Sequence, residues 1–300
     1  MQKNEKKAAL LLVITTLCYA TNHVIGRAVH GDLPPLGLSF WRWVAGAAIL
    51  FPFIASSFGK TIPLYRQHWR LFAVLGILIT GSTSLVLVGL NFTSATNTSL
   101  INATQPTITA LLCWVFFRDR LSFVQWIGIV LAFTGIALMM GRGDWLVLRS
   151  LSVNHGDLIQ LAAMFGFATY AINIRKIPRI FTTAEALFAV IIFGSLALIP
   201  FYLAESLLYK PMPFTLQTVV IVLTLSLLVS VIGMLFWTRG NQLIGPNRAV
   251  IYMNLIPPFG AILAVVFLHE TIAVYHMSGG ALICGGMWLS LRKYNSAPAP

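Results

Sequence analysis

The sequence predicts an all-helical membrane protein of ten transmembrane helices, arranged as two inverted five-helix repeats. Three observations predict this fold class. Hydrophobic residues make up 58% of the 300 residues and charged residues only 9%, with a mean hydropathy of +0.83, whereas soluble domains carry about 25% charged residues. The apolar segments are about twenty residues long, which matches the roughly 30 Å hydrocarbon core of a bilayer. The second half of the chain also repeats the first.

The apolar spans follow one another with short loops between them. We expect them at about 8–28, 37–57, 69–90, 95–117, 122–141, 156–176, 184–206, 215–239, 246–268 and 273–292. The longest connection, 142–155, is the candidate linker, so we expect a first repeat over 1–141 and a second over 156–300. The first span belongs to the repeat and lacks a small-residue cleavage site, so we expect no cleaved signal peptide.

A shift of 151 positions superimposes the two halves. The pairs that it relates are Tyr19 with Tyr170, Asn22 with Asn173, Pro106 with Pro257, Asp119 with Glu270, Gly128 with Gly279, and Gly135 with Gly286. Because each unit has five spans, an odd number, the second unit must lie inverted in the membrane relative to the first. Inverted repeats are typical of secondary transporters, in which the substrate binds near the midplane between the halves.

The basic residues set the expected orientation. The net charge of +12 does not indicate nucleic-acid binding, because the basic residues lie in short loops instead of forming a stripe with interleaved aromatic residues. With a cytoplasmic N-terminus, Arg142, Arg149 and Lys210 fall outside. The cytoplasmic side then receives Lys3, Lys6, Lys7, Lys60, Arg66, Arg70, Arg118, Arg120, Arg175, Lys176, Arg179, Arg239, Arg248, Arg292 and Lys293. Since Lys and Arg concentrate in cytoplasmic loops, we expect both termini in the cytoplasm.

Two passages carry a family resemblance. The segment "CYATNHVIGR" (18–27), with Pro34-Pro35 and Phe40-Trp41-Arg42, resembles the opening of an EamA repeat of the drug/metabolite transporter superfamily. The close of that repeat is similar to Pro106, residues 117–121 and residues 125–128, and the second copy matches it through Pro257, residues 269–272 and Gly279. The resemblance covers nearly the whole chain. It implies a ten-helix carrier of small metabolites, often an amino-acid exporter, in a bacterial inner membrane.

The chain departs from the family pattern at two positions. Asp119 stands where the family usually has Glu. In the second span the shift is near 148, which superimposes Gly46 and Pro52 on Gly194 and Pro200, and Val190 then stands where the second repeat would place the counterpart of Arg42. Neither departure affects the expected fold, but the second means that any role of Arg42 is not duplicated by the repeat.

Polar residues within the spans are the candidates for a substrate site, because a polar group in lipid is costly unless it is paired or faces a cavity. Helical spacing places Asn102 and Gln105 on one face of their span. We expect one cavity lined by the first, third, fourth, sixth, eighth and ninth spans. Its candidate substrate-binding residues are Tyr19, Asn22, His23, Thr83, Asn102, Gln105, Tyr170, Asn173, Ser230, Trp237, Tyr252 and Asn254. The alternative is that these groups form hydrogen bonds between packed helices.

Charge inside the membrane is sparse and basic. All eight Asp and Glu residues lie at or near loops, whereas Arg27 and Arg42 lie in the outer parts of their spans. These arginines either extend to the interface and pair with Asp32, or serve the cavity. His23 is the intramembrane group that titrates near neutrality, either as a hydrogen-bonded structural residue or as a proton carrier. Without a buried carboxylate to hold a cation, the pattern favours a carboxylate or zwitterionic substrate.

Pro106 and Pro257 occupy equivalent positions within their spans. Each removes a backbone donor and kinks a helix, so the pair forms either static kinks or hinges for alternating access. The fifth and tenth spans instead carry small residues that allow close packing, as scaffold or as a dimer face; these are Gly128, Ala132, Gly135, Gly279, Cys284 and Gly286. We expect the three cysteines to be packing residues.

The expected function is secondary transport of small metabolites, such as amino acids or related zwitterionic or carboxylate solutes, by alternating access around a central cavity. The alternative is a broad exporter of amphiphilic drugs. No enzyme activity, catalytic residue, metal or cofactor is expected, because His155, His269 and His276 are isolated. The expected partners are a small-molecule substrate and the lipid bilayer, without nucleic acid, and the chain is expected to be a monomer or a homodimer.

Overall fold

The computed structural model describes residues 2–117, 121–144, 154–244 and 250–290, and within these ranges all regular structure is helical. The all-helical part of the fold prediction is therefore confirmed. The elements are α1 (Gln2–Ala28), α2 (Pro35–Gln67), α3 (Trp69–Gly89), α4 (Ala95–Asn102), α5 (Gln105–Phe117), α6 (Phe123–Met140), α8 (His155–Asn173), the 3₁₀ turn η1 (Ile174–Lys176), α9 (Thr183–Leu208), α10 (Leu216–Leu225), the π-helix η2 (Ser226–Gly233), α11 (Met234–Ile244), the 3₁₀ helix η3 (Val250–Leu255), α13 (Ile256–Leu268) and α14 (Val274–Ser290).

The outer surface of the bundle is suited to lipid. Six helical stretches among the described residues are long and apolar enough to cross a bilayer: Glu5–Ala28, Pro35–Gln67, Trp69–Gly89, Phe123–Met140, Thr183–Leu208 and Leu216–Gly240. Large apolar side chains lie on the outside, such as Phe53, Phe123 and Leu207, which are 75%, 79% and 82% exposed. Exposed apolar surface on this scale is unfavourable in water and favourable in hydrocarbon, so this is a multi-pass membrane protein.

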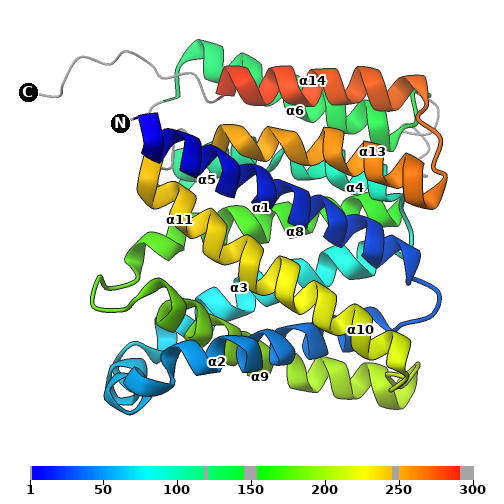
Figure 1. Cartoon of the computed structure of the whole chain (residues 1–300). Helices are drawn as coiled ribbons and strands as arrows, with labels where there is room; N and C mark the ends of the chain where they lie inside the picture. The colour runs from blue at the N-terminus through cyan, green and yellow to red at the C-terminus, as the bar shows by residue number, and fades with distance from the viewer. Residues whose placement is uncertain (1, 118–120, 145–153, 245–249, 291–300) are drawn as a thin grey trace, which may run out of the picture.

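The helices lie side by side, with two pairs at opposite edges of the bundle. Figure 1 shows α6 and α14 along the top edge and α2 and α9 along the bottom edge. The start of α1 and the end of α14 lie at the same end of the bundle (Figure 1). Between the two edges, α1 packs against α11 and α13, and α8 packs against α3 and α5.

Glycines bring α6 and α14 into backbone contact. A Cβ atom on Gly128 would lie 2.5 Å from the Ser290 nitrogen, and one on Gly135 would lie 2.7 Å from the Gly279 oxygen. These contacts run in opposite directions along the two helices, so α6 and α14 are antiparallel. The small residues of the fifth and tenth predicted spans are therefore used within the chain, where they let two helices approach closely.

Carboxylates near the two ends of α9 hold α9 against α2. At the start of α2, Glu205 of α9 accepts hydrogen bonds from the backbone nitrogens of Leu36 (3.1 Å) and Gly37 (2.7 Å). At the start of α9, Glu185 accepts a hydrogen bond from Ser57 Oγ of α2 (2.5 Å). A carboxylate at a helix start satisfies free N–H groups and complements the helix dipole. The two contacts show that α2 and α9 are antiparallel.

The predicted spans differ from the helices mainly where proline occurs. The span expected at 95–117 is interrupted between Asn102 and Gln105, and α13 begins with Ile256 after a 3₁₀ helix. Pro106 and Pro257 are thus each the second residue of a new helix, where a missing N–H costs little. Conversely, α2 continues past the predicted end at 57, through Pro63, to Gln67.

The start of α4 is capped from another part of the chain. After α13, His269 adopts a left-handed conformation (φ 54°) that ends the helix. The next residue, Glu270, accepts hydrogen bonds from the backbone nitrogens of Ala95 (2.9 Å) and Thr96 (3.0 Å), and from Thr96 Oγ1 (2.7 Å). Ser94 accepts a hydrogen bond from the next backbone nitrogen, that of Asn97. The first three free N–H groups of α4 therefore all have acceptors.

Candidate functional site

The most distinctive polar group in the interior is Arg42, on α2. Its side chain is fully buried, and Nη1 donates a hydrogen bond to Asn22 Oδ1 of α1 at 2.7 Å. Nε and Nη2 have no hydrogen-bond acceptor among the described residues. The guanidinium carbon lies 5.1 Å from the centre of the Trp43 ring. A guanidinium is charged at any physiological pH, so the interior holds a cation with two unsatisfied donors on its Nε–Nη2 edge.

The π-helix η2 forms the wall beside Arg42. Ser226 Oγ donates a hydrogen bond to the Arg42 carbonyl at 2.8 Å. One turn further along, Ser230 is fully buried and its hydroxyl has no partner among the described residues. A Cβ atom on Gly46, one turn after Arg42 on α2, would lie 3.3 Å from Ser230 Cβ. π-helical turns are rare and frequently occur at functional sites.

Tyr19 of α1 completes this interior group. Its ring packs against Gly233, at the end of η2, where a glycine Cβ would lie 2.9 Å from the ring. Tyr170 of α8 lies in the same buried cluster as Trp43, the residue after Arg42, and Val231 of η2. The structure thus brings together Tyr19, Asn22, Tyr170 and Ser230 of the predicted substrate site with Arg42. We call these five residues the central cluster.

His23 and Arg27 lie apart from the central cluster. Adjacent helical residues point about 100° apart, and while Asn22 faces α2, His23 faces α4, where its Nδ1 is 2.9 Å from Ser99 Oγ. Gly260 of α13 leaves room for the Ser99 side chain, because a Cβ there would overlap it. Arg27 Nη1 donates to the Leu90 carbonyl, just beyond α3, at 2.7 Å. His23 is thus hydrogen-bonded between helices, and the Arg27 guanidinium is bonded to a helix end.

A second group of predicted site residues lies at the two helix starts that contain proline. Asn102 and Gln105 are half-buried on either side of the break between α4 and α5. Tyr252 and Asn254 are half-buried in η3, just before α13, and Asn254 Oδ1 is buried without a partner among the described residues. Interrupted helices at equivalent positions in two halves are the pattern that secondary transporters use for binding sites.

The remaining predicted residues have local partners. Thr83 Oγ1 accepts a hydrogen bond from Trp43 Nε1 at 3.1 Å and donates to its own helix. Asn173 donates to the Thr169 carbonyl one turn earlier in α8. Trp237 is half-buried on α11. Thr83 and Asn173 thus have hydrogen-bond partners within the bundle, and their place in the substrate site stays a prediction.

The chain matches the EamA-like transporter family twice, over residues 6–141 and residues 154–292. It belongs to that family. The EamA-like chain resembles the uncharacterized transporter YyaM of Bacillus subtilis, with 27% identity over 91% of both chains. An uncharacterized transporter of Archaeoglobus fulgidus is 25% identical over 96% of this chain and 98% of that protein. A relative from Escherichia coli K12, named a probable amino-acid metabolite efflux pump, is 24% identical over 95% of both chains.

A solved crystal structure shares the fold of this EamA-like chain. It aligns with a TM-score of 0.61 at 18% sequence identity and covers 95% of this chain and 96% of the solved one. At that identity the likeness bears on the fold alone. Two of these relatives are named transporters and the third a probable efflux pump, and the chain spans nearly their full length.

Asp157 and Gln160 are two of the buried polar residues of this EamA-like protein that the sequence analysis did not single out. Asp157 is 1% exposed and accepts hydrogen bonds from Thr93 Oγ1 (2.5 Å) and Asn97 Nδ2. Gln160 is fully buried, and its Nε2 donates to the Val86 carbonyl at 3.0 Å. Asp157 lies in the first turn of α8, close to a loop, and its burial shows that the expectation of no buried carboxylate was wrong. Gln160 lies inside the predicted span 156–176, but on a different face of the helix from Tyr170.

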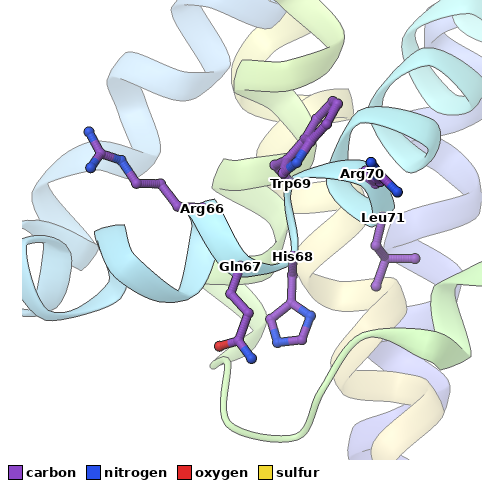
Figure 2. A pocket seen from close by; sticks show the side chains of 6 residues that line it. All are labelled: Arg66, Gln67, His68, Trp69, Arg70 and Leu71. Carbon is purple, nitrogen blue, oxygen red and sulfur yellow. The ribbon is translucent and has the colours of Figure 1, made fainter.

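A shallow hollow of about 420 Å³ lies on the surface at the turn between α2 and α3, lined by residues 66–71. Figure 2 shows that its polar side chains diverge: Arg66 points to one side, Trp69 points upward, and Gln67 and His68 point downward. Polar groups that bind a small molecule usually converge on it. This hollow therefore does not extend the central cluster, and it contains none of the predicted site residues.

Proposed function

We propose that this EamA-like protein is a secondary transporter of small metabolites that binds its substrate at the central cluster. The observation that carries the proposal is the buried Arg42 inside a multi-pass membrane protein, with two donor nitrogens that have no acceptor among the described residues. Ionisable groups within membrane bundles are costly, and as a rule they mark substrate or ion pathways. Asn22, Tyr19 and Ser230 supply the polar surroundings that a substrate site requires.

The same proposal includes ten spans in two inverted repeats, 1–141 and 156–300, joined by the linker 142–155. The starts of α5 and α13 are related by the 151-position shift, as are the starts of α6 and α14. The antiparallel contacts between α6 and α14 support the inversion, because these two helices occupy equivalent places in the repeats. The linker lies largely outside the described residues.

The proposed location is a bacterial inner membrane, with both termini in the cytoplasm. The start of α1 and the end of α14 lie at one end of the bundle (Figure 1), as an even number of spans requires. The excess of Lys and Arg on that side supports the orientation. Single cysteines at positions 119 and 270, in a background without the native cysteines, should label from opposite sides of the membrane. Labelling of both from one side would refute the inversion.

For the substrate we propose amino acids or related zwitterionic or carboxylate solutes. The printed name of the E. coli relative, a probable amino-acid metabolite efflux pump, supports this class. Counterflow in proteoliposomes tests it: purified protein is reconstituted, loaded with one unlabelled solute at a time, and assayed for uptake of its labelled form. We expect uptake for members of the amino-acid and carboxylate panel. Uptake confined to amphiphilic cations would replace this substrate class with the drug-export alternative, and no uptake of any solute would refute transport.

A further inference from the structure

The two Arg42 donors without an acceptor among the described residues indicate which chemical group of the solute would bind there. The Nη1 donor is occupied by Asn22, which leaves Nε–H and Nη2–H free. These two bonds lie on the same edge of the planar guanidinium and point in the same direction. Two parallel donors match the two oxygens of one carboxylate, which is why arginine recurs wherever a carboxylate is bound in a bidentate manner.

We propose that the Nε–Nη2 edge of Arg42 binds the carboxylate of the transported solute. This inference rests on the proposed function and specifies it: the solute carries a carboxylate, and Arg42 is its binding group. No described Asp or Glu forms a hydrogen bond with Nε or Nη2. The edge is therefore not already used by a structural ion pair of the described chain.

Arg42 is held in place before any solute arrives. Asn22 fixes the guanidinium from α1, and Ser226 fixes the backbone of the same residue from η2. A long arginine side chain loses conformational entropy when it is ordered. A guanidinium that is already oriented binds more tightly, because less of this entropy is lost on binding. Because Arg42 is fully buried, a solute reaches it only when the helices separate, as they do in alternating access.

Ser230 offers a third donor in the same region. Its hydroxyl is buried without a partner among the described residues, one turn from the Arg42 level along η2. A hydroxyl donates to a carboxylate oxygen as readily as to a carbonyl. We assign it the second contact to the solute, either to the carboxylate or to a polar group next to it.

The second repeat has no equivalent of this arrangement. Val190 occupies the position related to Arg42 and is 1% exposed in the apolar core. The carboxylate is therefore bound on the side of α1, α2 and η2 only. A solute with one carboxylate consequently binds in a single orientation, although the surrounding helices come from both repeats.

The test measures binding of matched solutes that differ only in the carboxylate. Isothermal titration calorimetry of the full-length protein in detergent compares L-leucine with L-leucinamide and phenylacetate with phenylacetamide. For the wild type we expect the acid to bind at least about tenfold more tightly than the amide in at least one pair, which corresponds to about 1.4 kcal/mol. Arg42→Gln should bring this ratio close to one. Arg42→Lys, which keeps the charge but loses the fork, should leave an intermediate ratio, and Ser230→Ala should weaken the acid more than the amide.

Arg27→Gln is the matched control, because the Arg27 guanidinium is bonded to the Leu90 carbonyl away from Arg42. It should keep the wild-type ratio. Equal or absent binding of acid and amide by the wild type in both pairs overturns the inference and needs no variant. An unchanged ratio in a folded Arg42→Gln protein overturns it as well. Uptake without any preference for acids defeats this inference but leaves transport intact, whereas binding of acids through Arg42 without uptake of any solute defeats the proposed function instead.

Discussion

Removing the Glu270 carboxylate should destabilise the protein by uncapping α4. Glu270→Ala leaves the Ala95 and Thr96 nitrogens without their acceptor, while Ser94 still caps Asn97. Ala95 and Thr96 are buried, and a buried donor that loses its partner costs about 1 kcal/mol, so the two nitrogens cost about 2 kcal/mol. The Thr96 hydroxyl also loses its acceptor but can rotate. Loss of a negative charge at a helix start adds about 0.5 kcal/mol. We expect a total of about 2.5 kcal/mol, and about half of that for Glu270→Gln, whose amide oxygen replaces one acceptor.

Thermal unfolding of the detergent-solubilised protein measures this effect. A change of 1 kcal/mol shifts the Tm of a 150–250-residue domain by about 2–4 °C, so Glu270→Ala should lower Tm by roughly 5–10 °C. Asp32→Ala is the control, because it removes one exposed carboxylate whose side chain does not cap a described helix. A Tm of Glu270→Ala that stays within about 1 °C of the wild type would contradict the capping argument, as would an equal loss in the control.

Three further predictions concern packing, coupling and motion. Gly286→Ala should sharply reduce the folded yield, because its Cβ meets the backbone of α6. Gly285→Ala should be tolerated, because its Cβ would lie at ordinary contact distance, 3.7 Å from Leu131 Cδ2. Equal yields of the two would contradict this packing. Uptake in proteoliposomes should be indifferent to an imposed pH step, because the His23 imidazole is bonded between helices; uphill accumulation that is lost in His23→Gln would show the opposite. Ala at Pro106 or Pro257 should slow uptake and shift spin-label distances at the bundle ends. Wild-type uptake together with wild-type distances would show that the breaks are static.

Helix positions were predictable wherever an apolar segment ended at a polar turn. The expected spans 69–90 and 122–141 agree with α3 and α6 to within one residue at each end. The break between Asn102 and Gln105 was not foreseen, because the polar face continues through it with helical spacing. A proline indicates a kink or a break in a helix. Whether the chain bends or starts a new helix depends on which neighbours satisfy the freed backbone groups.

The site was predictable as a set of residue types but not as a set of contacts. The sequence marked Arg42 as an intramembrane charge and Asn22 as an intramembrane amide, since both stand out in apolar spans. It could not pair them, because they lie on different helices and the facing of each helix depends on tertiary packing. The sequence analysis did not single out Ser99, and it could not pair Ser99 with His23, because the two residues lie on different helices.

The carboxylate contacts near the two ends of α9 restrict how this bundle can change shape. A gap can open between these helices at one end only after Glu205 releases the start of α2, and at the other end only after Ser57 releases Glu185. While both contacts persist, α2 and α9 keep their relative position and move as one rigid pair. The helices that tilt during a transport cycle then move relative to this pair. A crosslink that joins α2 to α9 should therefore not stop transport.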